Sequence, residues 1–191
     1  KNLSSVLSGP SILVTGSSGY IGQELVNQLK INSYDFIGVD RTTREETNIH
    51  SLDLADSVNL NKLLKEQKPS IIFHFGTHSA LAYRDKLLES YNEDSIVTYN
   101  LLSYLKDKPE TIFIYFSSSY VYSGIDSNKM VGESINLFPK HNFGLCKLFF
   151  ENLLQREHSN SIIFRLSSVF GNGESLHPNA IEMMSREAIN E

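Results

Sequence analysis

A length of 191 residues is enough to bury a sizeable hydrophobic core, and we predict one main domain without internal repeats or linkers. Hydrophobic residues make up 40% of the chain and charged residues 20%, which excludes a wholly disordered protein. The net charge of -5 gives no electrostatic basis for binding nucleic acid or an anionic membrane surface.

Cysteine content and hydropathy narrow the cellular setting. Cys146 is the only cysteine, so an intramolecular disulfide and a cysteine-based metal cluster are excluded. No apolar run approaches the roughly 20 residues of a membrane span. Residues 1–10 lack the apolar segment of a signal peptide. We therefore expect a cytoplasmic protein.

Short apolar segments alternate with helical patterns along the whole chain. The predicted strands are Ile12–Thr15, Phe36–Val39, Ile49–Leu52, Ile71–Phe75, Ile112–Phe116 and Ile162–Leu166. The predicted helices are Tyr20–Lys30, Val58–Gln67, about Tyr83–Lys106, and Phe143–Glu157. This alternation predicts an α/β fold with a doubly wound parallel sheet. Ligands in such a sheet bind at the carboxyl ends of the strands, so the residues that follow each strand matter most.

After the first predicted strand comes a glycine-rich turn, in the stretch SILVTGSSGYIG (residues 11–22). Gly16, Gly19 and Gly22 are equally spaced and lead directly into a predicted amphipathic helix. A strand, glycine turn and helix in this order can bind a pyrophosphate at the helix N-terminus. Taken alone, the pattern is equally compatible with a turn that binds nothing.

Acidic residues follow the second and third predicted strands. Asp40 follows Gly22 at close to the roughly 20-residue offset at which an acid binds the adenosine ribose, which favours NAD over NADP. Arg41 and Arg44 could instead receive a phosphate, and Asp40 could simply open a turn. Asp53 is the better candidate for a contact to adenine, whereas Asp56 is the better candidate for a helix N-cap.

The fourth and fifth predicted strands also end in small or polar residues. Gly76 permits a close backbone approach to a ligand, and His74 and His78 are interpreted as structural, with no metal site. The hydroxyl-rich stretch FSSSYVYS (residues 116–123) is either a polar ligand contact or a serine-stabilised turn. In the last predicted helix, Phe143 and Lys147 share one face.

Taken together, these motifs resemble the extended short-chain dehydrogenase/reductase family, in its group of NAD-dependent nucleotide-sugar epimerases and dehydratases. The matching stretches are TGSSGYIG, VDR, DLAD, SSSYVYS and RLSSVFGNG. The resemblance implies a Rossmann-type dinucleotide-binding domain over residues 1–175, with 176–191 a remnant or start of the substrate-binding part. Expected cofactor contacts are Gly16, Ser18, Gly19, Tyr20, Ile21, Gly22, Asp40, Arg41, Asp53, Leu54, Phe75, Gly76 and Lys147.

The family's catalytic residues carry over only in part. Ser118 matches the serine that hydrogen-bonds the reacting sugar, and Lys147 matches the lysine of a Tyr-x-x-x-Lys pair. Phe143 occupies the tyrosine position and cannot transfer a proton. Either the change was made to trap a ligand, or the base has naturally been lost or replaced, with Tyr120 and Tyr122 as nearby candidates. The family pattern is also altered at Asp94, Val97, Ser123 and Ser168.

The resemblance implies a protein that moves hydride to and from bound NAD on a nucleotide-linked sugar, and that is inactive if Phe143 has no substitute. The alternative is a non-catalytic NAD-binding module for sensing or protein association. Family members commonly form homodimers through the helices after the fourth and fifth strands. Leu145, Leu148, Phe149 and Leu153 are expected either at such an interface or in the core.

Overall fold

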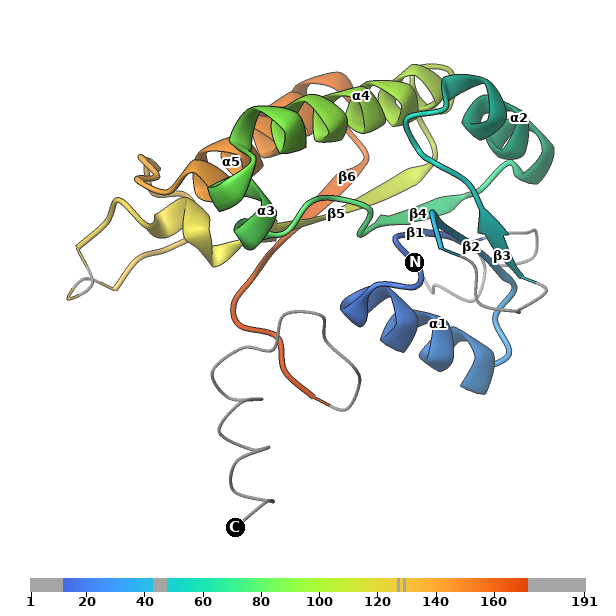
Figure 1. Ribbon diagram of the computed structural model, residues 1–191, viewed down its shortest axis with the longest axis horizontal. Helices are drawn as coiled ribbons and strands as arrows, with labels where there is room; N and C mark the ends of the chain where they lie inside the picture. The colour runs from blue at the N-terminus through green and yellow to red at the C-terminus, as the bar shows by residue number, and fades with distance from the viewer. Residues whose placement is uncertain (1–11, 43–47, 127, 129, 172–191) are drawn as a thin grey trace, which may run out of the picture.

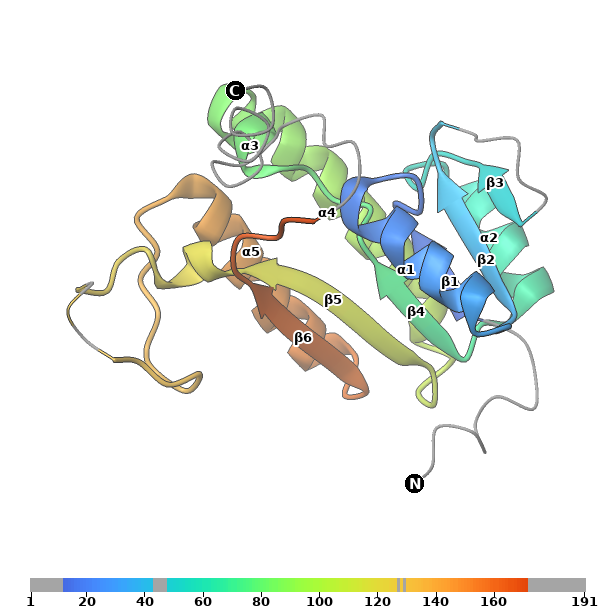
Figure 2. The ribbon, with the colours of Figure 1, turned by 90° about the horizontal axis from the view of Figure 1, so that it is seen from below.

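Six parallel strands form a single sheet in the computed structural model, which describes residues 12–42, 48–126, 128 and 130–171. The sheet order is β3-β2-β1-β4-β5-β6 (Figures 1 and 2). The strands are β1 (Ile12–Thr15), β2 (Phe36–Asp40), β3 (Ile49–Ser51), β4 (Ile71–His74), β5 (Ile112–Ser118) and β6 (Ser161–Leu166). The doubly wound parallel sheet predicted from the sequence is thereby confirmed.

Helices cover the two faces of the sheet unequally in the described part of the chain. One face carries α2 (Ser57–Gln67), α4 (Leu87–Leu105) and α5 (Asn142–Glu157), whereas α1 (Tyr20–Ile31) lies on the other (Figure 1). The short helix α3 (Ala80–Asp85) and the 3-10 turn η2 (Ser119–Tyr122) follow the carboxyl ends of β4 and β5. None of the described helices is long and apolar enough to cross a membrane.

The hydrophobic core is divided by the sheet, because alternate residues of a strand point to opposite faces. Leu13, Ile72 and Phe113 are buried on the side of α2, α4 and α5. Ile12, Val14 and the neighbouring strand residues pack on the side of α1. Full burial of one such side chain contributes about 1.5–3 kcal/mol, so the strands are fixed by burial on both faces.

The predicted long helix over residues 83–106 is wrong, because two helices occupy this region. Lys86 takes a non-helical conformation (φ -141°, ψ 58°), which separates α3 from α4. The Ser79 hydroxyl caps the start of α3 by accepting a hydrogen bond from the Ala82 amide. The break places Tyr83 against the side of α4, where it contributes to the site described below.

The predicted ends of β1 are correct, and those of the other strands differ from the structure by one or two residues. The difference is largest at β5. This strand continues to Ser118 because Ser117 and Ser118 pair with Arg165 and Leu166 of β6. The predicted domain boundary at residues 175 and 176 lies outside the described residues.

The order of the strands determines where a ligand can bind. The chain runs outward from β1 to β2 and β3, and then returns to β4 on the other side of β1. The connections after β1 and β4 therefore diverge to opposite sides and leave a crevice at the carboxyl ends of these strands. The glycine turn follows β1 and the Gly76 segment follows β4, so both border this crevice.

Candidate functional site

The glycine turn is compact, and the positions of its glycines are required by close contacts. Gly16 has φ +68°, and a Cβ atom there would lie 2.7 Å from the Gly76 amide nitrogen. A Cβ atom on Gly22 would collide with the Gly16 carbonyl oxygen. Gly19 is the N-cap of α1, where no side chain caps the helix and no acidic residue occupies the first turn. This helix N-terminus fits the diphosphate of a dinucleotide.

Asp40 ends β2 beside the glycine turn. One of its carboxylate oxygens accepts a hydrogen bond from the Ser18 amide at 3.0 Å, and the other accepts from the Thr42 amide and hydroxyl at 3.3 Å. Each carboxylate oxygen can accept more than one hydrogen bond, so Asp40 keeps capacity for a ribose hydroxyl. The local bonds fix its orientation toward the cleft.

The two aspartates in the segment after β3 have different roles. Asp56 is the N-cap of α2 and accepts hydrogen bonds from the amides of Val58 and Asn59, as the sequence predicted. Asp53 accepts a hydrogen bond from the Ala55 amide at 2.9 Å and also lines the cleft. Its contact to adenine remains a prediction.

Leu54 and Gly76 meet across this end of the cleft. A Cβ atom on Gly76 would lie 2.6 Å from Leu54 Cδ1, so a larger residue would have to displace the end of the Leu54 side chain. The Phe75 ring stacks on the Phe116 ring at 4.0 Å, which leaves the Phe75 backbone to border the cleft. Tyr20 is held at its hydroxyl by the Gly171 carbonyl.

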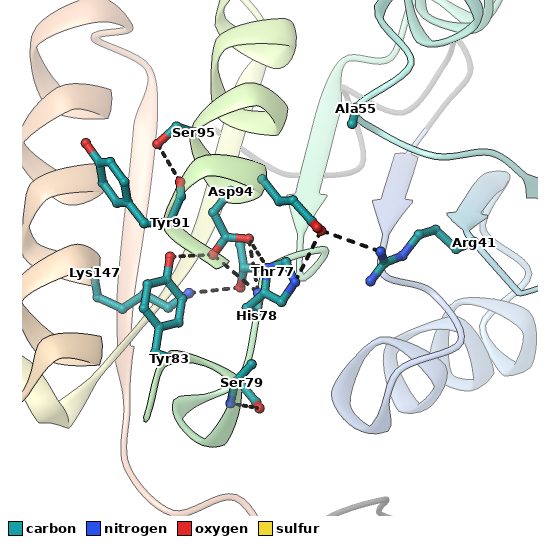
Figure 3. A network of polar contacts seen from close by, with 12 residues as sticks. Arg41, Ala55, Thr77, His78, Ser79, Tyr83, Tyr91, Asp94, Ser95 and Lys147 are labelled. Atoms are coloured by element: carbon teal, nitrogen blue, oxygen red, sulfur yellow. Dashed lines mark hydrogen bonds and ion pairs between the residues drawn. The ribbon is translucent and has the colours of Figure 1, made fainter. Parts of the chain in front are cut away.

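Lys147 is buried on α5, next to Thr77 of the cleft. Its Nζ atom donates to Thr77 Oγ1 at 2.9 Å (Figure 3). It also donates to the Phe116 carbonyl at 3.0 Å. Burial lowers the pKa of Lys147 to about 8, opposed by the charges of Asp94 and Glu151. The side chain is therefore held in one place with a proton that is readily lost.

Phe143 lies one helical turn before Lys147 in a cage of aromatic side chains. Its ring packs against Tyr83 and Tyr120, with ring centres 5.5 and 5.7 Å away. Ser118 ends β5, and its hydroxyl accepts a hydrogen bond from the Tyr120 amide. Of the two candidate replacement tyrosines, Tyr122 is engaged by Arg165, whereas Tyr120 is exposed beside Phe143.

A network around Asp94 joins residues that the sequence did not bring together (Figure 3). The Asp94 carboxylate is buried and accepts hydrogen bonds from the Tyr83 hydroxyl at 2.8 Å and the His78 amide at 3.1 Å. It also bonds His78 Nδ1 at 2.8 Å, and this bond raises the pKa of His78. The acidic partner of His78 comes from α4, a separate element that no sequence spacing connected with the histidine.

His74 plays a separate structural part. It is buried, its Nδ1 lies 2.7 Å from Thr15 Oγ1, and burial lowers its pKa to about 3. Only the approach of β1 to β4 brings Thr15 to it. Among the described residues, no three His, Cys, Asp or Glu side chains gather closely enough to hold a metal ion.

The glycine turn, the segments after β2, β3 and β4, and the carboxylates Glu93 and Asp94 of α4 line one cleft of about 430 Å³. Gly16, Gly19, Asp40, Arg41, Asp53, Leu54, Phe75, Gly76, Thr77, His78, Glu93 and Asp94 are among its lining residues. Thr77, Glu93 and Asp94 were missed as site residues; Asp94 was noted only as a departure from the family pattern. The cleft places the amide donors of the glycine turn beside the Asp40 carboxylate, as a dinucleotide requires.

Comparisons with known proteins agree with this geometry. UDP-glucose 4-epimerase of Schizosaccharomyces pombe is 29% identical over 77% of this chain and 46% of its own length. Methionine adenosyltransferase 2 subunit beta of Xenopus laevis is 24% identical over 90% of this chain and 51% of its own. The structure of Thermus thermophilus UDP-glucose 4-epimerase, solved in complex with NAD, has a TM-score of 0.72 at 17% identity, covering 81% of this chain and 54% of that one.

The chain thus spans about half the length of the curated relatives that it matches. A family model, described as the NAD dependent epimerase/dehydratase family, matches residues 12–190, nearly the whole sequence. This match confirms the resemblance seen in the motifs, and the chain belongs to the NAD-dependent epimerase/dehydratase family.

Proposed function

We propose that this chain is the dinucleotide-binding part of an epimerase/dehydratase-type protein that acts on a nucleotide-linked sugar. The observation that carries the proposal is one cleft lined by the glycine turn, Asp40 and Thr77, with Lys147 of α5 bonded to Thr77. A diphosphate at α1 and an adenosine ribose at Asp40 direct the rest of a dinucleotide toward Lys147. The similarity to UDP-glucose 4-epimerase supports a nucleotide-sugar substrate.

Each part of the site has its own proposed binding role. The N-terminus of α1 binds the diphosphate, and Asp40 binds the ribose hydroxyls and disfavours an added phosphate. Lys147, with its fixed ammonium, holds the hydroxyls of the second ribose, and Ser118 orients a sugar hydroxyl next to it. NAD bound in this cleft supplies hydride transfer.

Phe143 limits what the residues can do. A phenyl ring neither gives nor accepts a proton, and a positioned general acid or base typically contributes about 10²–10⁴ in rate. We therefore infer that NAD is held and that the chain turns over sugars slowly or not at all, unless an exposed group such as Tyr120 substitutes.

A second candidate function is a non-catalytic NAD-binding subunit. Phe143 favours it, and so does the similarity to methionine adenosyltransferase 2 subunit beta, whose name describes a subunit of a larger enzyme. In this case the cleft would bind NAD to stabilise a protein surface, and restoring the tyrosine would not restore activity.

Association into a homodimer is also proposed. Ile96 and Tyr99 on α4 and Leu145 and Phe149 on α5 are exposed, while Cys146, Phe150 and Leu154 turn toward the core. The two helices pack against each other, so their exposed apolar residues can meet a second copy. Phe149→Asp should convert the dimer to a monomer in light scattering.

Calorimetric titration with NAD⁺ and NADH tests the proposed function. Saturable binding with one site per chain is expected. Gly19→Ala should weaken binding because its methyl group enters the diphosphate site, whereas Gly132→Ala, where nothing lies within 4 Å of an added Cβ, should not. Folded protein that binds neither form of NAD would refute the proposal.

A further inference from the structure

Glu93 lies between the side chains of Arg41 and His78 at the proposed adenosine end of the cleft. Its Oε2 atom is 3.7 Å from Arg41 Nη1 and 3.4 Å from His78 Nε2. Arg41 follows β2, His78 follows β4, and Glu93 belongs to α4, so the three residues come from different sides of the crevice. Figure 3 shows Arg41 and His78 on opposite ends of this connection.

The second nitrogen of His78 is fixed independently. Its Nδ1 bonds the buried Asp94 carboxylate at 2.8 Å, which leaves Nε2 to face Glu93. Asp94 and Glu93 raise the pKa of His78, whereas Arg41 opposes them. Because Asp94 holds the His78 ring in one orientation, Nε2 stays directed toward Glu93. The Glu93 carboxylate is thereby held at the cleft.

Arg41 is the side chain next to Asp40 that would distinguish NADP from NAD. It follows Asp40 directly and lines the same cleft. A free guanidinium there would bind the additional phosphate of NADP in a bidentate manner, as arginine commonly does. The pair with Glu93 instead draws the guanidinium toward α4 and offsets its charge.

We propose that Glu93 is a cofactor-specificity residue that favours NAD over NADP by pairing with Arg41. This inference rests on the proposed dinucleotide site. A 2′-phosphate entering the cleft must displace Glu93 from Arg41 and also approaches the carboxylates of Asp40 and Glu93. The 2′-hydroxyl of NAD needs neither step, since Asp40 alone can accept its hydrogen bond.

The size of the effect follows from exposure. The Arg41 side chain is 65% exposed and that of Glu93 is 39% exposed, so water screens their attraction. We expect Glu93→Gln to raise NADP⁺ affinity by about 2- to 5-fold and to leave NAD⁺ affinity within about 2-fold, as for the loss of an exposed ion pair.

Calorimetric titration of the whole chain with NAD⁺ and with NADP⁺ measures this ratio. Glu89→Gln is the matched control, because Glu89 lies on the same helix and pairs with Lys86 away from the cleft. The double variant Arg41→Gln with Glu93→Gln should lose the gain in NADP⁺ affinity. Together with the single variant Arg41→Gln, these proteins form a double-mutant cycle that isolates the coupling between the two side chains.

Three results would overturn the inference while leaving the proposed function intact: an unchanged NADP⁺/NAD⁺ ratio in Glu93→Gln, an equal gain for both cofactors, or a gain that persists without Arg41. Failure of the wild-type chain to bind either dinucleotide would refute both. A nuclear magnetic resonance titration gives a readout without cofactor. The pKa of His78 should fall in Glu93→Gln and stay unchanged in Glu89→Gln, and an unchanged pKa in both would contradict the pairing.

Discussion

The ammonium nitrogen of Lys147 lies 5.5 Å from the centre of the Phe143 ring. The lysine that would lower the pKa of a neighbouring tyrosine is thus present, buried and bonded, but it faces a ring with no ionisable group. The groups proposed to hold a cofactor are therefore in place, and phenylalanine stands at the position where the family pattern has the proton-transferring tyrosine.

Phe143→Tyr should raise turnover of a UDP-sugar by about 10²–10⁴-fold, the usual contribution of a general acid or base. The introduced hydroxyl would lie beside Lys147, whose positive charge favours the tyrosinate. Conversion of the sugar, followed by chromatography, measures the change.

Phe138→Tyr is the control for this substitution, because Phe138 is exposed and does not line the cleft. It should leave turnover unchanged. A Phe143→Tyr protein that binds NAD but remains inactive would contradict the catalytic proposal and support the non-catalytic subunit.

Gly22→Ala should destabilise the fold by about 1–3 kcal/mol or more, the usual cost of forcing atoms into a packed site. The new Cβ atom collides with the Gly16 carbonyl, and this outweighs the higher helix propensity of alanine. Urea denaturation followed by circular dichroism measures the loss. Gly132→Ala should show no comparable change, and equal effects of the two variants would contradict the packing argument.

Glu151→Gln should lower the free energy of unfolding by about 3 kcal/mol, because it leaves an arginine without its buried counter-ion. Glu151 is buried on α5 and accepts hydrogen bonds from Arg165 of β6, the shortest at 2.7 Å. Denaturation with urea checks the value. Asp85→Asn, which breaks an exposed pair with Arg84, should be silent, and a silent Glu151→Gln would show that the buried pair contributes little.

The buried His74 makes stability depend on pH in the acid range. Its pKa is lowered from 6.5 to about 3 by burial, so the unfolded chain binds the proton more readily between these values. The stability that it contributes is complete above the unfolded pKa and is lost as the pH falls toward 3. His74→Gln should therefore show a shallower loss of stability from neutral to acid pH.

Urea denaturation at a series of pH values measures this slope. The exposed His50 provides the control, since His50→Gln should keep the slope of the wild-type chain. If His74→Gln keeps the wild-type dependence of unfolding free energy on pH, His74 does not cause the loss of stability in acid.

The fold could be predicted because its signals are local. Buried strands such as Ile12–Thr15 are continuous apolar runs, and the glycines of the turn are spaced by the geometry of one strand-to-helix connection. The capping role of Asp56 was likewise predictable, since the cap and the helix that it begins are adjacent in sequence. The prediction of a single long helix over residues 83–106 was wrong, because the helix is interrupted at Lys86. No proline or glycine marks this break in the sequence.

The sequence by itself determined the sheet, the glycine turn, the acid at Asp40 and the loss of the tyrosine at Phe143, because each depends on neighbouring residues or on a linear motif. Only the tertiary structure decided that Asp94 binds His78 and Tyr83, and that Glu93 stands between His78 and Arg41. These partners come from separate elements, and only the return of the chain from β3 to β4, on the other side of β1, brings them to one cleft. Charge pairing across such a cleft is a property of packing, which no local spacing encodes.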